Sequence, residues 1–461
     1  FLTSLIVFYP AVLKYLVYIF KPTMLVYVAL FFVESAALYV YYYGWHSMTG
    51  GFSKKLHLFT GFILTLAGTA IMFIANAWVT FMMSPAGVDK YGALTGGVWQ
   101  AVNNPLWSAM NLHRFVANIA YGASIVGAYA AYKFLSARSR DEKAHYDWMG
   151  HTASFISIAS LLPLPFAGYW LTAEIYRYSQ QMGITLMGGA FGWLFIIQAV
   201  LIGALFLSAN YYLWCAMSRG GAVKYRGWIK YIACALFFSF LVWFTPHTLT
   251  LTAEEAASGG QYHSILGPLG LMPAKNTAVN IMIIFTYLTF LLYRRSSRSA
   301  CVTPSVNALQ AALFSAGVVN IIFLGAYYGY FTDTAYKVAS SVAQVLTTLI
   351  VICASAVIEH FAFSGEKGRK TVEWGNMPAR SQYALILIAV SFTWLMGLMG
   401  YVRSAVRQHW HVFTIMKDAS ADAFTPPIAY AAKVTSIGTI IFMALVVIVF
   451  WLSEFRGKKH E

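Results

Sequence analysis

Long apolar stretches alternate with short polar joints along almost the whole chain. About 20 consecutive apolar residues in helical form are enough to cross the hydrocarbon core of a bilayer. The pattern therefore predicts an all-α protein, a polytopic transmembrane bundle of about twelve spans. The predicted spans are 3–20, 23–43, 57–83, 110–135, 150–173, 185–217, 227–248, 276–293, 306–330, 336–363, 382–403 and 428–453.

The basic residues follow the same alternation. Twenty Lys and Arg lie in every second joint, beginning with Lys54 and Lys55, whereas seven lie in the other joints. Since cytoplasmic loops of membrane proteins are enriched in Lys and Arg, we expect the basic joints and both termini to be cytoplasmic. The outer joints 84–109, 249–275 and 404–427 are long, and long loops on a rigid scaffold often carry function.

Composition supports a membrane protein and excludes other classes. The 461 residues are 59% hydrophobic and 10% charged, with a mean hydropathy of +0.63. The net charge of +15 comes from loop residues without the basic and aromatic pattern of a nucleic-acid site, so no nucleic acid is expected as a partner. The four cysteines show no CxxC or CxxCH spacing, which excludes a covalent c-type heme and an iron–sulfur cluster. We expect one integral membrane domain over 1–461.

A histidine and a methionine on different predicted spans lie at similar depth. His113 is about one turn into its span from the outer side, and Met282 is about two turns into its own. At about 1.5 Å of rise per residue, their depths differ by about 5 Å. This placement predicts an axial pair for a b-type heme, and His/Met ligation raises the heme potential, as an electron acceptor for quinol requires. The competing interpretations are an interfacial histidine and a core-filling methionine.

Other polar residues near the membrane are candidates for quinol or heme binding. His247 lies at the outer end of the span 227–248 with Glu254 and Glu255 after it, where these groups could bind a quinol hydroxyl and accept its protons. The alternative is an ordinary helix-capping loop. Additional candidate heme ligands are His57, His151 and His360 at inner helix ends, and His409 and His411 at an outer end.

Several segments resemble subunit I of cytochrome bd-type quinol oxidases in order, spacing and sidedness. They are Phe31 to Ser35 with Gly44 and Trp45, Ala75 to Trp78 with Pro85, Asn104 and Pro105 eight residues before His113, Asn280 to Met282, Gly400 with Arg407, Gln408 and Trp410, and the last span. The resemblance implies heme b ligation by His113 and Met282, with Trp78 also near the cofactor. It further implies that Arg407 and Trp410 contact heme propionates and that Glu34 lies on a proton path.

The chain also departs from this family. Val26 and Ser404 stand where the family has carboxylates, and the first family helix, which holds a histidine ligand, has no counterpart after Phe1. The quinol-binding loop is reduced to the joint 169–183, and there are additional helices around 185–248 and 306–363. We therefore expect heme b without heme d.

The sequence thus predicts a heme b-containing subunit of a respiratory complex in the energy-transducing membrane of a bacterium or archaeon. It would oxidise quinol near the outer face and pass electrons to an extracytoplasmic c-type cytochrome or another heme partner, beside a second membrane subunit. One alternative is a true quinol:oxygen oxidoreductase of the cytochrome bd type. Another is a heme-free subunit, either an anchor for a partner or a proton- or ion-translocating subunit with Glu34, Glu359 and Lys14 as its charged path.

Overall fold

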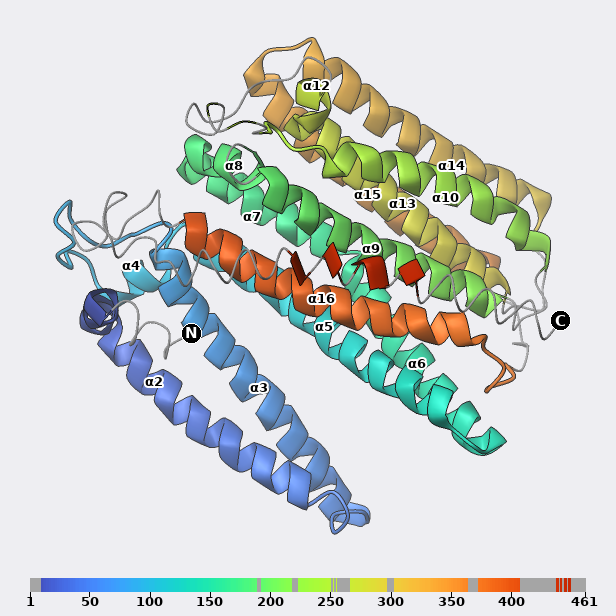
Figure 1. The fold of residues 1–461 in the computed structure, drawn as a ribbon, viewed down its shortest axis with the longest axis horizontal. Coiled ribbons are helices and arrows are strands. Elements are labelled where there is room, and N and C mark those ends of the chain that lie inside the picture. Colours follow the sequence, from blue (N-terminus) through green and yellow to red (C-terminus); the bar gives the residue numbers. More distant parts are fainter. Residues whose placement is uncertain are drawn as a thin grey trace. The chain divides into compact units, whose positions relative to one another are not determined.

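The structure is a computed structural model that describes residues 10–188, 192–217, 223–249, 252, 254, 266–296, 302–363 and 372–406, together with scattered positions within 437–448. Within these residues the regular elements are all helices, as predicted (Figure 1). The chain forms two compact units. The first comprises Phe1–Val116, Ala167–Gly183 and Arg403–Ala431, and the second comprises Ala117–Phe166, Ile184–Val402 and Ala432–Glu461.

The first unit is built on a helical hairpin. Helix α2 (Pro10–Tyr43) runs beside α3 (Gly51–Phe81), and the short α4 (Val98–Val102) packs on both. At the end of the hairpin near α4, large side chains such as Phe20, Trp78 and Phe81 form a buried core. Along the rest of the hairpin, apolar residues such as Phe32 and Phe62 are exposed, as expected for a lipid-facing surface.

Helix α2 replaces the two spans predicted at 3–20 and 23–43. The polar residues Lys21 and Thr23 around Pro22 suggested a joint, but the helix continues through them with one non-helical residue, Phe20. Proline is tolerated in transmembrane helices because neighbouring groups satisfy the freed backbone, and it bends the helix rather than ending it. Because α2 crosses the membrane once, Pro10 and the lysines Lys54 and Lys55 lie on opposite sides of the membrane. The two predicted spans would have put the start of the chain on the same side as these lysines.

Three helices follow α4. Helix α5 (Trp107–Ser136) leads to α6 (Arg140–Leu161), and α6 is followed by α7 (Leu164–Tyr178). A capping box starts α6, because Ser139 accepts a hydrogen bond from the Glu142 amide while the Glu142 side chain accepts one from the Arg138 amide. Pro163 separates α6 from α7 within the span predicted at 150–173, since proline has no amide hydrogen to continue the helix.

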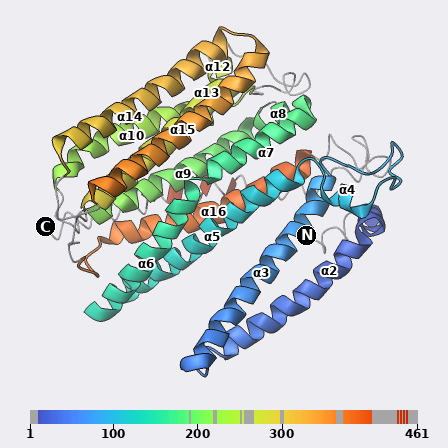
Figure 2. The ribbon, with the colours of Figure 1, turned by 180° about the vertical axis from the view of Figure 1, so that it is seen from behind.

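The second unit is organised around one central helix. Helix α13 (Met272–Ser296) packs against α9 (Gly192–Met217), α10 (Val223–Phe244), α14 (Pro304–Phe323) and α15 (Thr334–Ala362), as Figures 1 and 2 show. A five-residue π-helix, η3 (Leu324–Tyr328), extends α14. The remaining elements are α8 (Gln180–Met187), α12 (Leu266–Gly270) and α16 (Ala379–Val406).

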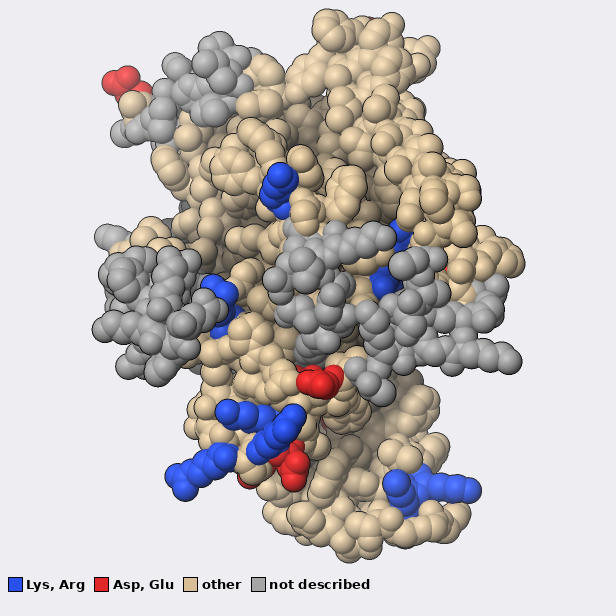
Figure 3. All heavy atoms as spheres, turned by 90° about the vertical axis from the view of Figure 1, so that its right-hand side faces the viewer, with Lys and Arg blue, Asp and Glu red and all other residues tan. Residues whose placement is uncertain are grey.

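Ten helical segments of the described chain are long and apolar enough to cross a membrane, with α6 and α7 counted together. Most predicted spans therefore correspond to helices, while the last, 428–453, lies largely outside the described residues. On the face drawn in Figure 3, Lys and Arg side chains lie as separate small groups, one of them beside Asp and Glu side chains. This distribution is typical of helix-end charges on a membrane protein.

Candidate functional site

The start of α5 is fixed by a buried asparagine. The side-chain amide of Asn104 donates to the carbonyls of Ala77 at 3.3 Å and Ala101 at 3.1 Å, and its oxygen accepts from Ser84 at 3.1 Å. These bonds join the end of α3, helix α4 and the turn before α5. They set the position of His113, which lies in the second turn of α5 and is half-buried.

A polar cluster surrounds His113 within the first unit. Asn76 of α3 donates from its side-chain amide to Asn111 Oδ1 at 2.8 Å, and Arg114 donates to Asn76 Oδ1. Asn76 is fully buried, so α3 and α5 meet here through hydrogen bonds rather than apolar contacts. The guanidinium of Arg114 is thereby held next to the imidazole of the preceding residue.

The ring of His113 faces a glycine of α7. A Cβ built on Gly168 would lie 3.6 Å from His113 Cδ2 and 3.7 Å from Nε2. No hydrogen bond engages either ring nitrogen of His113 among the described residues. A histidine that binds a metal needs a ring nitrogen without a hydrogen bond and open space in front of it, and glycine at position 168 provides that space. The adjacent Arg114 can pair with a carboxylate. These residues therefore fit the imidazole side of a heme b.

The other predicted residues of the first unit lie in the α2–α3 hairpin. Trp78 is buried, donates to Thr23 at 3.4 Å and packs on Tyr27. Glu34 is half-buried in the middle of α2, where its carboxylate lies against Gly68 of α3, a position at which a Cβ would be 2.8 Å from Oε1. Trp78 thus contributes to packing, whereas Glu34 is a carboxylate held within a membrane-spanning hairpin.

The inner-end histidines have different surroundings. His57 Nε2 is 2.8 Å from the carbonyl oxygen of Tyr41, and its ring stacks on the Tyr41 ring. His360 is exposed near the end of α15. Because Nε2 of His57 is engaged by the backbone, its predicted role as a heme ligand has no support from this geometry.

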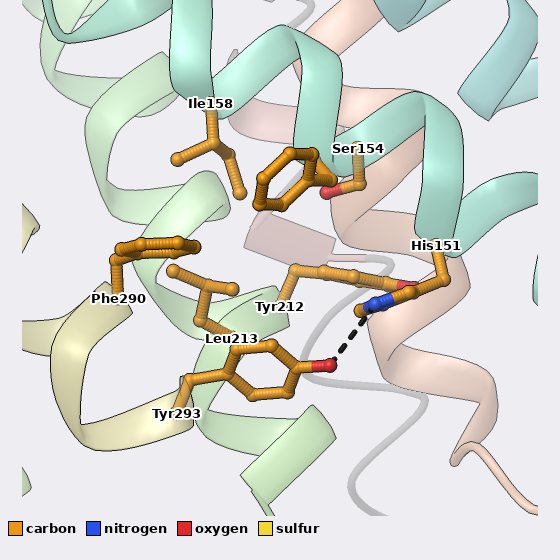
Figure 4. A pocket seen from close by; sticks show the side chains of 8 residues that line it. His151, Ser154, Ile158, Tyr212, Leu213, Phe290 and Tyr293 are labelled. Atoms are coloured by element: carbon orange, nitrogen blue, oxygen red, sulfur yellow. Dashed lines mark hydrogen bonds between the residues drawn. The ribbon is translucent and has the colours of Figure 1, made fainter. Parts of the chain in front are cut away.

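His151 of α6 lines a small cavity in the second unit (Figure 4). Its Nε2 is 3.0 Å from the hydroxyl of Tyr293, and Tyr212, Phe290 and Ile158 complete much of the wall. The volume of the cavity is about 10 Å³, room for about one water molecule. The cavity is too small for a porphyrin, so a second heme on His151 stays a prediction.

His247 lies just after α10, where two glycines of neighbouring helix ends, Gly188 and Gly270, approach its backbone closely. Its amide donates to the carbonyl of Met187 at 2.9 Å. A Cβ on Gly188 would lie 3.2 Å from the Cβ of His247, and a Cβ on Gly270 would lie 2.9 Å from its Cα. Glycine at both positions therefore allows the ends of α8 and α12 to approach the His247 backbone closely.

The environment of His247 favours its neutral form. Partial burial lowers its pKa below the ordinary 6.5, the hydrogen bond with the Gly270 backbone opposes this shift, and the charge of Lys275 lowers the pKa further. Glu254, in the joint that follows, is exposed. A neutral imidazole can accept a proton from a bound hydroxyl.

Lys275 is a buried cation that the sequence analysis treated as a loop residue. It lies in the first turn of α13 and is 1% exposed. Its Nζ is 3.6 Å from the centre of the Phe195 ring and has no hydrogen-bond partner among the described residues. A lysine two residues after Pro273, at the start of an apolar stretch, was the available signal. Arg114 is likewise an ionisable residue within an apolar stretch, the predicted span 110–135, and the sequence marked it in the same way.

Met282 is buried in α13 and packs with apolar side chains of α9, α10 and α13, among them Met217, Leu236 and Leu292. His113 belongs to the first unit and Met282 to the second, so their pairing stays a prediction. The described residues contain no cluster of three or more His, Cys, Asp or Glu side chains that could hold a metal ion. The predictions for Glu255, Arg407, His409, Trp410 and His411 fall outside the described residues.

Comparison with known proteins identifies a family for the N-terminal part of the chain. Residues 3–192 match the family described as cytochrome bd terminal oxidase subunit I. The resemblance inferred from the sequence is thereby confirmed over this segment, which includes Glu34, Trp78 and His113. No curated protein matches the chain.

Proposed function

We propose that this chain, whose residues 3–192 match the family model of cytochrome bd terminal oxidase subunit I, is a heme b-carrying membrane subunit that oxidises quinol. It would act in the plasma membrane of a bacterium, or in the equivalent membrane of an archaeon. Heme b, when bound, accepts and releases single electrons, which suits a two-electron donor that is oxidised in steps. The roles of this chain's own residues follow from their surroundings.

The arrangement at His113 is the observation that carries the proposal. Within the family-matched segment, the His113 ring has uncommitted nitrogens, faces Gly168 and has Arg114 beside it. His113 would supply one axial nitrogen to the iron, and Arg114 would pair with a propionate. The hydrogen bonds among Asn76, Asn111 and Arg114 would hold this part of α5 in place.

Met282 is proposed as the second axial ligand. A thioether opposite an imidazole raises the heme potential, which favours electron transfer from quinol. The apolar residues around Met282 would keep water from this side of the iron. Arg407 and Trp410 are proposed to contact the propionates as well.

Quinol oxidation is proposed at His247. Its lowered pKa keeps the imidazole neutral near pH 7, so that it can accept the proton that a quinol hydroxyl loses on oxidation. The exposed Glu254, and Glu255 after it, would pass the proton to the outer aqueous phase. The electrons would continue to a c-type cytochrome or another heme partner, with a second membrane subunit beside this chain.

Oxygen reduction is the second candidate, and the family description as a terminal oxidase favours it. In that case Glu34, held within the α2–α3 hairpin, would deliver protons toward the oxygen site. Val26 and Ser404, in place of the family's carboxylates, support heme b over heme d and hence electron transfer to a partner over oxygen reduction.

The proposal is tested by optical spectroscopy of the purified chain. Reduced-minus-oxidised spectra should show a low-spin b-type band, and His113→Ala should remove that band together with one heme per chain. The matched control is His145→Ala, since His145 is an exposed histidine of α6 and the substitution is the same. A band that persists unchanged in His113→Ala would exclude His113 as a ligand.

A further inference from the structure

Helix α15 is amphipathic in the opposite sense to a helix of a water-soluble protein. Its lipid-accessible side carries Leu346, Ile350 and Val357, all exposed. Its buried side is mainly polar. The residues buried on it are Ser340, Ser341, Gln344, Thr348, Val351, Ser355 and Glu359.

Helix α13 presents a matching row of buried polar residues to α15. Gln344 donates to Thr277 at 3.2 Å, and about one turn of α13 further on, Thr348 donates to Asn280 at 2.7 Å. Closer to the C-terminal end of both helices, Arg295 donates to Glu359 Oε1 at 2.8 Å. The seam between α13 and α15, which lie side by side in Figures 1 and 2, is therefore a column of polar groups.

This column is long enough to cross a membrane. From Asn276 to Arg295, α13 rises by about 28 Å at 1.5 Å per residue, which is close to the thickness of a hydrocarbon core, about 30 Å. Helix α14 and the π-helix η3 close the column on a third side. Gly325 of η3 approaches so closely that a Cβ there would lie 2.8 Å from Gln344 Nε2. π-Helices of this kind often occur at functional positions.

Four buried polar atoms of the column have no hydrogen-bond partner among the described residues. They are Asn276 Nδ2 and Gln344 Oε1 toward the N-terminal end of α13, and Ser355 Oγ and Glu359 Oε2 toward its C-terminal end. Each of these residues is at least nine-tenths buried. Buried polar atoms without a protein partner are commonly satisfied by ordered water, so these atoms mark hydrated positions along the seam.

An apolar layer separates the two polar halves. Between Thr348 and Ser355, α15 places Val351 on its buried side, and Ile284 of α13 and Ile321 of α14 pack in the same cluster. The interruption measures about 10 Å along the helix axis. Gly317 allows α14 to approach this layer, since a Cβ there would lie 2.4 Å from Val351 Cγ2.

We propose that the α13–α15 column conducts protons across the membrane through two hydrated halves joined at the Ile284, Ile321 and Val351 layer. A proton enters as hydronium at one mouth, and each water or hydroxyl oxygen along the column accepts one proton while it releases another. Glu359 Oε2 takes up and releases the proton at the second mouth, so every group returns to its starting charge. A metal cation needs several oxygen ligands at once and cannot be passed between single oxygens in this way, which leaves protons as the species that can pass.

The test is proton uptake by vesicles that contain the purified full-length chain and an enclosed pH-sensitive dye, driven by a potassium diffusion potential with valinomycin. The wild-type chain should take up protons faster than protein-free vesicles do. Thr348→Val should lower the rate about tenfold, because a hydroxyl of the chain is replaced by a group that cannot hydrogen-bond. Glu359→Gln should lower it similarly.

The neighbouring Thr347→Val is the matched control. Thr347 of α15 accepts a hydrogen bond from the exposed Asn320 of α14, outside the column, so the proton uptake of this variant should stay within about twofold of wild type. Equal rates for Thr347→Val and Thr348→Val, or wild-type uptake no faster than in protein-free vesicles, would show that the column is structural only.

A substitution in the apolar layer provides an independent measurement if Thr348→Val does not fold. Val351→Thr should raise proton uptake several-fold, because it adds a hydroxyl within the layer, whereas Val351→Leu should not. Neither variant should admit sodium, measured with a sodium-sensitive dye. Unchanged proton uptake in Val351→Thr, or a sodium current in the wild-type chain, would overturn the proposal.

Discussion

His247 and His113 are histidines whose chemistry is set by their neighbours. His247 is partly buried, bonded to the Gly270 backbone and close to Lys275, and the net effect is a lowered pKa. His113 has Arg114 beside it and the side-chain-free Gly168 in front of it. The first environment suits a proton acceptor, and the second suits a ligand with a free ring nitrogen.

The pH dependence of quinol oxidation follows from the state of His247. Imidazolium cannot accept a proton, so the rate should fall as the pH drops through the lowered pKa, below 6.5, and should be insensitive to His247 above that value. His247→Ala should lower the rate about 100-fold and remove this acidic limb. The measurement is quinol oxidation against pH, with heme content determined in parallel.

The control is again His145→Ala, which should retain both the rate and the acidic limb. Wild-type turnover in His247→Ala would contradict the proposed role, and a parallel loss of heme would indicate a structural effect instead.

Single residues differ in how far the sequence reveals them. His113 could be singled out because an ionisable residue inside an apolar span and a short motif before it both mark the position. The partners of His113, such as Asn76 and Gly168, come from other helices, and a single sequence does not state which side chains meet across helices. Lys275 was missed because hydropathy places it at the edge of a span, whereas packing against Phe195 and Trp243 buries it.

At the scale of helices, hydropathy located most spans but not their internal breaks. Pro22 was interpreted as the end of a span, although α2 continues through it, while Pro163 divides a predicted span into α6 and α7. Whether a proline bends a helix or ends it depends on the neighbours that satisfy the freed backbone groups, and these are tertiary contacts. The sequence also did not reveal the buried polar face of α15, because the average hydropathy of this helix is that of an ordinary span.

The packing of α14 on α15 predicts that a larger residue at Gly317 destabilises the protein. A Cβ at this position would lie 2.4 Å from Val351 Cγ2, so Gly317→Ala requires the two helices to move apart. We expect a loss of about 1–3 kcal/mol in the free energy of unfolding, as for other overpacked cores. Unfolding in detergent, followed by circular dichroism, measures the change.

Gly122→Ala is the comparison, because no atom lies within 4 Å of a Cβ built at this exposed position of α5. This variant should be unchanged or more stable by up to about 1 kcal/mol, from the higher helix propensity of alanine. Equal stabilities of the two variants would contradict the close approach at Gly317.

At the scale of the whole molecule, the family match covers only the first part of the chain. The match ends at residue 192, where α9 begins, so the column-forming helices α13, α14 and α15 lie outside it. The buried polar groups of these helices therefore belong to a part of the chain that the match does not cover. The sequence predicted helices in these regions, but their role depends on which faces meet.

The pigment content of the purified chain tests the whole-molecule proposal. Because Val26 and Ser404 replace carboxylates, extraction should yield heme b and no chlorin-type heme d, with no red absorbance band of that pigment. The measurement is a pyridine hemochrome spectrum together with iron analysis. Heme d in the extract would favour the oxygen-reducing alternative.

The order in which the helices are made gives α13 a particular difficulty during biosynthesis. It leaves the ribosome before α15, yet Thr277, Asn280 and Arg295 bond to side chains that α15 supplies. Until those arrive, its polar groups would face lipid, where each one is costly. The helix should therefore remain at the insertion machinery until α15 emerges, and a chain truncated between α13 and α15 should be a target for membrane proteolysis.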